Sequence, residues 1–293
     1  MRLSVVIVAH NAASEITDCL KSVQGLATEI ILVNNQSTDV TVAIAKKFSA
    51  KIFDHPNDPL HLNRSKNFGF TKAQGDWVLS LDADERISPE LAKEINRIKK
   101  GESLPRQGLS LKTAAYQMPR KNIIFGQWIE HGLWYPDDQL RLFQTGKGEF
   151  PGLHNHESLK VKGKVGRLTG HLIHYNYRTV SQYMHKINDV YSDNEVEQLL
   201  AKGYKLNWAD AIKFPVSDFL TNFFARESYK DGLHGLVLSL LQAFYMFVVF
   251  AKAWEKQDFP HQSISLPDTH QVLKNKAGEW HHWYHLKNKS NLF

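Results

Sequence analysis

The first hundred residues alternate between short apolar runs and segments with helical periodicity. Runs such as Leu3–Ala9 and Trp77–Leu81 are almost wholly apolar, as strands buried on both faces are. The segments between them place apolar residues three and four positions apart, which predicts helices with one buried face. This alternation predicts an α/β fold with a mainly parallel sheet and helices on both of its faces.

Four strands and four helices are expected from these patterns. The strands are Leu3–Ala9, Glu29–Val33, Lys51–Phe53 and Trp77–Leu81, and the helices occupy about residues 14–23, 39–48, 63–74 and 88–100. Ser14 is expected to cap the first helix and Ser88 the fourth, because serine side chains accept hydrogen bonds from free N–H groups there. Gly101 is expected to end the fourth helix.

Polar residues directly follow three of these strands. They are His10-Asn11, Asn34-Asn35-Gln36 and Asp82-Ala83-Asp84. In parallel sheets, ligands bind beyond the carboxyl ends of the strands. We therefore expect these three groups to meet at one binding site.

Composition and charge limit the classes of function. A net charge of +6 and a pI near 9.1 favour anionic partners such as nucleotides or membrane surfaces. A nucleic-acid partner is not expected, because no nucleic-acid-binding motif accompanies the charge. The glycine-rich phosphate loops of dinucleotide-binding and P-loop proteins are absent. The single cysteine, Cys19, lies on the apolar side of a predicted helix and is expected to be a core residue.

Two carboxylates, Asp82 and Asp84, end the fourth strand at a turn. Carboxylate oxygens are hard ligands that bind Mg²⁺ or Mn²⁺, and such a cation offsets the charge on a departing diphosphate. A solvated turn that only caps the next helix would show the same pattern. The strand position, and the polar ends of the neighbouring strands, favour a metal site.

Four segments, taken in order, resemble the inverting glycosyltransferases of family 2, which have the GT-A fold. They are residues 5–11, 29–39, 66–69 and 75–85. Further on, Trp134-Tyr135-Pro136-Asp137, residues 139–143 and His156-Glu157 are similar to the subgroup that adds glucose to the heptose of lipopolysaccharide core. The resemblance extends over about residues 3–255 and is strongest up to Glu85.

The resemblance implies roles for individual residues. Asp84 would bind the metal, and the residues expected to bind the UDP-sugar are His10, Asn11, Asn34, Arg64, Lys66 and Asp82. Two positions depart from the family pattern: Ala12 replaces an acidic residue, and Asn34 replaces an aspartate. The amide oxygen of Asn34 can still accept a hydrogen bond from uracil N3–H.

A general base must take the proton of the attacking acceptor hydroxyl. Glu157 is the expected base because it matches the His-Glu pair of the subgroup. Asp137 and Asp138 are alternative bases, and a surface glutamate paired with Lys160 or Lys162 is the alternative interpretation of Glu157.

Other side chains between residues 104 and 177 keep more than one interpretation each. Arg141 either binds an acceptor phosphate or forms a salt bridge at the edge of the core. His171 and His174 are expected to bond acceptor or phosphate groups or to satisfy buried backbone groups, and completion of the metal shell by one of them is the alternative. Three aromatic side chains either stack on sugar rings or belong to the core: Trp128, Trp134 and Tyr135.

The C-terminal third contains a long apolar run. Residues 179–202 are expected to form a helix, and Leu233–Ala251 follows without a charged residue. At 1.5 Å per residue this run is just long enough to span a hydrocarbon core of about 30 Å. It either spans a membrane, lies in the interface or is buried in protein. The interfacial arrangement is favoured, because basic residues bracket the run and the tail is basic and aromatic.

Three regions are therefore expected. Residues 1–103 form the nucleotide-sugar-binding half, residues 104–205 the acceptor-binding half, and residues 206–293 a helical, membrane-associated region. The expected activity is metal-dependent, inverting transfer of a hexose, namely glucose, from a UDP-sugar to a cell-envelope glycolipid such as lipopolysaccharide core. The expected location is the inner face of the cytoplasmic membrane. A catalytically silent nucleotide-sugar or glycolipid scaffold and a nucleotide-sugar phosphohydrolase are the alternatives.

Overall fold

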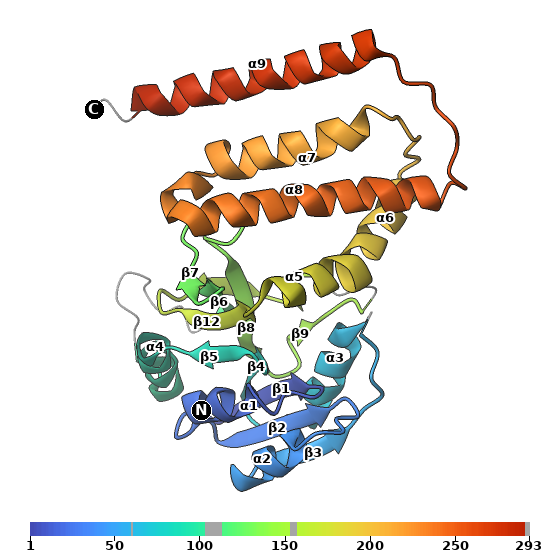
Figure 1. Cartoon of the computed structure of the whole chain (residues 1–293). Helices are drawn as coiled ribbons and strands as arrows, with labels where there is room; N and C mark the ends of the chain where they lie inside the picture. Colours follow the sequence, from blue (N-terminus) through green and yellow to red (C-terminus); the bar gives the residue numbers. More distant parts are fainter. Residues whose placement is uncertain (60, 103–112, 153–156, 291–293) are drawn as a thin grey trace. The chain divides into compact units, whose positions relative to one another are not determined.

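A ten-stranded mixed sheet occupies the N-terminal part of the chain, and helices follow it in sequence (Figure 1). The computed structural model describes residues 1–59, 61–102, 113–152 and 157–290. Its strands are β1 (Leu3–Ala9), β2 (Glu29–Asn34), β3 (Lys51–Asp54), β4 (Trp77–Asp82), β5 (Glu85–Ile87), β6 (Thr113–Ile124), β7 (Gln127–Trp128), β8 (Asp138–Gln144), β9 (Gly148–Glu149), β10 (Lys160–Val161), β11 (Lys164–Arg167) and β12 (Leu172–Tyr177). Its α-helices are α1 (Ile16–Val23), α2 (Thr41–Lys47), α3 (Leu62–Lys72), α4 (Pro89–Lys100), α5 (Val180–Lys186), α6 (Ser192–Ala201), α7 (Asp210–Leu220), α8 (Gly232–Glu255) and α9 (Leu266–Ser290).

The strand order along the sheet is β3-β2-β1-β4-β8-β6-β12-β5. The first four strands are parallel, as predicted, with β1 paired to β2 on one side and to β4 on the other. From β8 onward the path of the sheet becomes antiparallel, since β8 runs against both β4 and β6. The predicted parallel sheet is therefore the half built by the first hundred residues.

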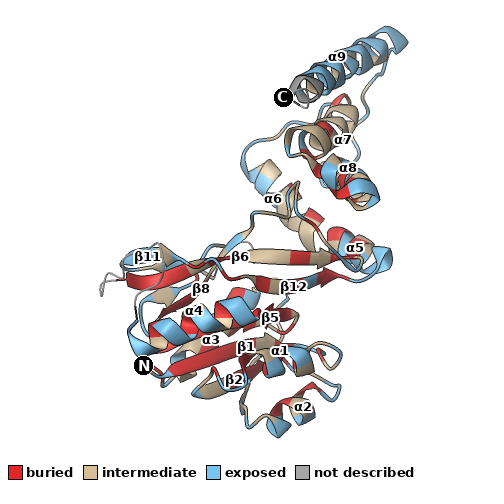
Figure 2. Ribbon diagram, turned by 90° about the vertical axis from the view of Figure 1, so that its left-hand side faces the viewer, coloured by how far each residue is buried: buried red, intermediate tan, exposed pale blue. Residues whose placement is uncertain are grey.

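Different helices cover the two faces of this sheet. Alternate residues of β1 such as Val5 and Ile7 pack in one core cluster with buried side chains of α1 and α4. Val6, between them, belongs to a second cluster that includes Phe68 and Phe70 of α3. Figure 2 colours β1 as buried along most of its length. The period-two alternation of a strand thus requires a helix on each face, which explains the nearly unbroken apolar run.

Gly69 allows α3 to lie close to the sheet. A Cβ atom at this position would lie 2.5 Å from a methyl group of Val6 and 2.7 Å from one of Val33. Any side chain there would force the helix away from β1 and β2. This contact sets the distance between the sheet and α3, the helix that carries Arg64 and Lys66.

Most helix boundaries follow the predicted signals. Ser88 caps α4 by accepting a hydrogen bond from the N–H of Leu91 at 3.2 Å, and Gly101 ends it with φ +75°. The predicted cap at Ser14 is wrong, because α1 begins after Glu15 without a side-chain cap. The N–H of Ile16 donates to the carbonyl of Ala12 at 2.9 Å. This backbone hydrogen bond satisfies a donor at the start of the helix, so a serine side chain is not required there.

The described chain forms two compact units. Unit 1 comprises residues 1–122 and 136–176, and unit 2 comprises residues 123–135 and 177–293. The predicted segment 104–205 is therefore shared between the units, while 206–293 lies wholly in unit 2. The reason is that β6 and β12 begin in the large sheet and end in unit 2, where the end of β6 pairs with β7.

Unit 2 is mainly helical, which confirms the predicted C-terminal helical region. The predicted helix at 179–202 is present as α5 and α6 joined by a π-helical turn, η1 (Ile187–Tyr191). A second π-turn, η2 (Thr221–Ala225), and a 3-10 turn, η3 (Ser228–Asp231), lie between α7 and α8. Tyr183, Ile187 and Leu238 are the centre of a buried cluster between α5, η1 and α8.

Candidate functional site

The carboxyl ends of β1, β2 and β4 meet at one edge of the sheet. Ala9 pairs with Asn34, and Val8 pairs with Asp82, so the residues that follow these strands are neighbours. His10 confirms the proximity, because its Nδ1 lies 2.6 Å from the carbonyl oxygen of Asn35. The predicted meeting of the three polar strand ends is confirmed.

Asn11 and Asn34 shape the loop after β2. The side-chain oxygen of Asn11 accepts hydrogen bonds from the N–H groups of Thr38 and Asp39, at 2.8 and 3.3 Å. Asn34 accepts from the N–H of Ser37 at 3.0 Å and donates to Asp54 at 2.7 Å. These two amides organise the loop backbone, which leaves the ring of His10 exposed at the strand ends.

Asp82 stands between two cations. Its Oδ1 lies 2.8 Å from Nζ of Lys66, which α3 supplies, and its Oδ2 lies 2.7 Å from Nη2 of Arg141 on β8. Burial alone would raise the pKa of Asp82, but the charges of Lys66 and Arg141 outweigh it and hold the pKa far below its usual range. Asp82 is therefore an anion at every physiological pH, with both oxygens engaged.

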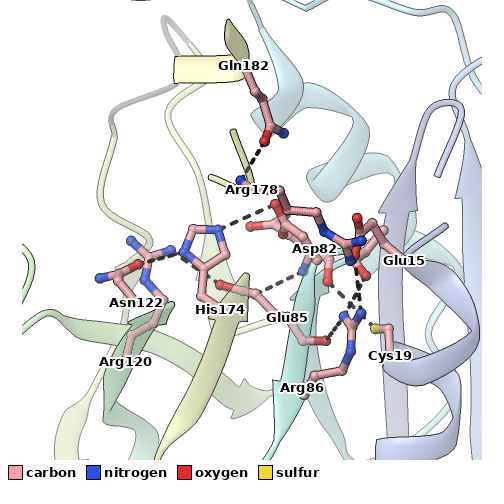
Figure 3. Close-up of polar contacts among 12 residues, drawn as sticks. Glu15, Cys19, Asp82, Glu85, Arg86, Arg120, Asn122, His174, Arg178 and Gln182 are labelled. Carbon is pink, nitrogen blue, oxygen red and sulfur yellow. Dashed lines mark hydrogen bonds and ion pairs between the residues drawn. The ribbon is translucent and has the colours of Figure 1, made fainter. Parts of the chain in front are cut away.

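A buried charge network continues from Asp82 (Figure 3). Glu85 is fully buried; its Oε1 lies 2.8 Å from Arg141 and 3.3 Å from Arg120, and its Oε2 accepts from the N–H of Asp82 at 2.9 Å. Arg120 in turn bonds Asp137 at 2.7 Å. The carboxylates of Asp82, Glu85 and Asp137 are thus compensated by Lys66, Arg141 and Arg120, as buried charges require.

His174 connects this network to the second carboxylate of the acidic turn. Its Nδ1 lies 2.7 Å from Oδ1 of Asn122, and its Nε2 lies 3.4 Å from Oδ2 of Asp84. Asn122 donates through Nδ2 to Asp137 at 3.0 Å, which orients the amide with its oxygen toward His174. An amide oxygen only accepts, so His174 carries a proton on Nδ1 and, when neutral, turns the lone pair of Nε2 toward Asp84.

Arg64 and Glu157 lie near the N-terminal turn of α3. Arg64 donates to the carbonyl of Gly152 at 3.1 Å, and it is turned to that loop, whereas Lys66 reaches Asp82. Glu157 accepts a hydrogen bond from the N–H of Gly152 at 2.6 Å, and its Oε2 lies 3.5 Å from Nδ2 of Asn63. His156, which the sequence pairs with Glu157, lies outside the described residues.

The alternative bases have other partners. Asp137 accepts from Arg120 and Asn122 on one oxygen and from Gln139 on the other, at 2.6–3.0 Å. Burial would raise the pKa of Asp137, but the charge of Arg120 and these hydrogen bonds lower it, which makes the carboxylate a poor proton acceptor. Asp138 is paired with Arg167 at 3.0 Å.

Among the described ranges, no group of three or more His, Cys, Asp and Glu side chains is arranged to hold a metal ion. Asp84 and His174 are a pair, so a cation held there would need its remaining ligands from a bound substrate or water. Mg²⁺ and Mn²⁺ are commonly bound in this way, by one or two protein groups together with substrate phosphates.

The structure bears on three other sequence interpretations. Arg141 does not face an acceptor, because its side chain is 6% exposed and bonds Asp82 and Glu85. Trp134 packs edge-on against Tyr177 within unit 2, and Trp128 against Tyr135, so these rings take part in packing. The thiol of Cys19 is fully buried, and burial raises its pKa, as expected for a core residue.

The sequence interpretation missed Glu85, Arg120 and Asn122. A signal existed, since Arg120 and Asn122 occupy alternate positions of one strand, and so do Gln139 and Arg141. Polar residues at period two point to one face of a sheet. A polar face on two neighbouring antiparallel strands would have predicted a buried network.

Replacing Arg141 should destabilise the protein strongly. Arg141→Met leaves Glu85 and Asp82 without their shared cation, and removal of one partner from a buried pair costs about 3–5 kcal/mol. The matched control is Arg167→Met, whose side chain is 51% exposed, where a loss of roughly 0–1 kcal/mol is expected. Urea unfolding measures both; similar small losses would show that Arg141 does not hold these carboxylates.

Comparison with known proteins agrees with this architecture. The family described as "Glycosyl transferase family 2" matches residues 4–156. An uncharacterised glycosyltransferase of Rickettsia typhi is 30% identical over 263 residues, covering 87% of each chain. The lipopolysaccharide core biosynthesis glycosyltransferase LpsC of Rhizobium meliloti is 25% identical, over 87% of this chain and 92% of that one.

Among solved structures, residues 1–349 of S. aureus TarS in complex with UDP-GlcNAc are similar over 99% of this chain and 92% of that one, with 16% identity and a TM-score of 0.45. The family match and the curated relatives are decisive for classification. The chain belongs to glycosyl transferase family 2, and the expected α/β fold of the GT-A class with a C-terminal helical region is confirmed.

Proposed function

We propose that this glycosyltransferase moves a hexose, namely glucose, with inversion from a UDP-sugar to a cell-envelope glycolipid such as lipopolysaccharide core. The observation that carries the proposal is the acidic turn: Asp82 is fixed by Lys66 and Arg141, and Asp84 faces the ring of His174. The similarity to LpsC, whose name gives lipopolysaccharide core biosynthesis, supports the acceptor class.

The donor would bind at the strand ends. His10, Asn11 and Asn34 would contact the uridine, and the second lone pair of the Asn34 amide oxygen is suited to uracil N3–H. Lys66 would exchange part of its pairing with Asp82 for the diphosphate, because its ammonium group already lies at the end of β4. Arg64, held at Gly152, would lie farther along the phosphates.

Asp84 and His174 fit a divalent cation. A carboxylate oxygen and an imidazole lone pair 3.4 Å apart have no hydrogen between them when His174 is neutral, and a shared cation would relieve that repulsion. Mg²⁺ or Mn²⁺ held here would offset the negative charge that develops on the diphosphate leaving group. His171 is the weaker candidate, since it is not part of the Asn122–His174–Asp84 chain.

Glu157 would act as the general base. Its carboxylate lies beside the N-terminal turn of α3, the helix that brings Lys66 to Asp82. It would accept the proton of the acceptor hydroxyl as that oxygen attacks the anomeric carbon from the side opposite the diphosphate. Because Asp137 and Asp138 are engaged with arginines, they are the poorer candidates.

Release of UDP separates the proposed activity from its alternatives. The purified protein is incubated with UDP-glucose and Mn²⁺, with and without a lipopolysaccharide-core extract. Release that depends on the extract supports the transferase. Equal release in both samples indicates a phosphohydrolase, and donor binding without release indicates a silent scaffold.

We further propose a peripheral location on the inner face of the cytoplasmic membrane. In the part of the chain that the structure describes, one helical stretch, Ser228–Glu255, is long and apolar enough to cross a membrane, with a mean hydropathy of 1.9. Length and composition alone do not separate a membrane helix from a packed one. The full chain is expected in the membrane fraction of cells and is expected to be released by detergent; recovery of all of it in a low-salt soluble fraction would contradict this location.

A further inference from the structure

Exposed apolar side chains are concentrated at the C-terminal end of the chain. Twelve of the eighteen large exposed apolar residues that the structure describes lie between Leu233 and Leu286, and the other six are spread over the rest. Single exposed apolar residues are normal on protein surfaces, but a contiguous group indicates an interaction site. The exposed apolar side chains of this protein therefore gather on α8, on α9 and on the segment between them.

On α8 the exposed residues form a stripe. They are Leu233, Leu240, Phe244, Phe247 and Trp254, with exposed fractions from 40% to 73%. Their spacing of seven, four, three and seven positions puts them on one side of an α-helix. The rings of Phe244 and Phe247 lie 6.3 Å apart, so the apolar surface is continuous in the middle of the helix.

The opposite side of α8 is occupied by protein. Leu238, Val249 and Ala253 are buried against α5, η1 and α6. Gln242 accepts a hydrogen bond from the hydroxyl of Tyr183 at 3.1 Å, and Lys252 pairs with Asp193 at 3.0 Å. The helix is thus amphipathic by virtue of its packing: its polar groups face neighbouring helices, and its apolar stripe faces outward.

This packing disfavours a membrane-spanning arrangement. The segment packed against α8 carries two exposed polar side chains, the imidazole of His185 and the carboxylate of Asp189, 2.6 Å apart and 75% and 45% exposed. If α8 crossed the bilayer, this pair would enter the hydrocarbon with it, where charged groups are costly. A helix that lies flat immerses the stripe alone.

Charge and side-chain type select a lipid surface as the occupant. Figure 2 colours most of α9 as exposed, and its sequence holds four lysines against two acidic residues. Glu279, one of the two, already pairs with Lys276 at 2.8 Å, while Lys274 is exposed beside Leu273. Trp280 and Tyr284 are also exposed on α9. Lysines interleaved with tryptophan and tyrosine are suited to anionic headgroups.

We propose that α8 lies in the plane of the membrane interface, with the stripe from Leu233 to Trp254 immersed to one shallow depth and α9 contacting anionic headgroups. The inference rests on the membrane location proposed above and specifies its contact surface. In this arrangement the enzyme and a glycolipid acceptor both lie at the membrane surface. The enzyme then reaches the acceptor by lateral diffusion in the plane of the membrane.

Depth measurements test this arrangement on the full chain. Cys19 is fully buried, so a single introduced cysteine can be labelled selectively with an environment-sensitive fluorophore. The labelled positions are Leu233→Cys, Phe244→Cys and Trp254→Cys, with Glu197→Cys on the exposed side of α6 as the control. Vesicles of phosphatidylcholine, with and without phosphatidylglycerol, are the probe, and lipid-borne quenchers report depth.

The three stripe positions should show increased, blue-shifted emission and equal, shallow depth with the anionic vesicles, and Glu197→Cys should not change. A depth greatest at residue 244 and small at 233 and 254 would indicate spanning and overturn the proposal. Blue-shifted emission without vesicles that rises with protein concentration would indicate a second copy on the stripe, and would also overturn it. If the emission changes at none of the three stripe positions when vesicles are added, the proposal is also overturned.

A double variant separates membrane binding from catalysis. Phe244→Ser with Phe247→Ser should weaken vesicle binding on the order of 10²-fold, since each phenyl side chain contributes substantially when immersed. UDP release on a delipidated core acceptor in solution should stay unchanged. Val180→Ser, 49% exposed on α5, is the matched control and should affect neither. If the unaltered protein binds vesicles but transfers no sugar, the proposed function is refuted while the proposed membrane-contact surface is supported.

Discussion

Glu157→Gln is expected to abolish most sugar transfer while donor binding persists. A general base contributes about 10²–10⁴-fold to rate, and glutamine has the shape of glutamate without its basicity. The amide oxygen of the new side chain can still accept the N–H of Gly152, which the glutamate accepts at 2.6 Å, so the loop should keep its conformation. Single-turnover transfer with saturating UDP-glucose and Mn²⁺ measures the loss, and thermal shift measures donor binding.

The control for this substitution lies in the rival carboxylates. Asp138→Asn should leave the rate nearly unchanged, because Asp138 forms a partly exposed ion pair with Arg167. Asp137→Asn should lower stability through its contacts with Arg120, and should leave the rate per folded molecule close to normal. If Asp137→Asn loses transfer while remaining folded and Glu157→Gln does not, the base has been assigned to the wrong residue.

Asp84→Asn is expected to remove metal-dependent turnover. Outer partners of metal ligands typically contribute about 10–100-fold, and loss of a ligand itself should reach at least the upper end of that range, roughly 10²-fold. The amide keeps the volume of the side chain but weakens the interaction with a hard cation. Steady-state UDP release across a Mn²⁺ titration measures the effect.

Two controls make the Asp84 result specific. Asp18→Asn removes an exposed carboxylate on α1 and should change neither metal response nor rate. His174→Ala should shift the Mn²⁺ concentration needed for activity to higher values, because His174 faces Asp84 at 3.4 Å. Normal turnover of Asp84→Asn at ordinary Mn²⁺, with an intact fold, would remove this residue from the reaction.

The parallel half of the sheet could be predicted from local patterns because its strands are buried on both faces. Leu3–Ala9 must be apolar at every position when helices cover both sides, and this leaves a signal in the sequence. The polar residues after β1, β2 and β4 were recognisable for a related reason: parallel strands end at the same edge. Asp82 and Asp84 could thus be proposed as site residues before any contact was known.

The antiparallel half gave no comparable signal. The register between β6 and β8 shifts at Tyr116 and Gln117, and polar residues of these strands are paired with residues distant in the chain. From the sequence, Asp137 is an alternative base, Arg141 is either a phosphate ligand or a salt bridge at the edge of the core, and Arg120 is not singled out, because charge in a sequence does not reveal its partner. Long-range pairing makes Asp137 a counter-ion of Arg120, whereas Glu157, the proposed base, accepts the backbone N–H of Gly152.

The sequence by itself determined the α/β class, the positions of the parallel strands and the acidic turn, since hydrophobic periodicity and turn residues act locally. Only the tertiary structure decided which cations hold Asp82, which imidazole faces Asp84, and which side of α8 is left exposed. The apolar run of α8 is compatible with a spanning, a buried and a surface helix alike. Its environment follows from the helices packed on one side of it, and that packing depends on contacts between segments far apart in the chain.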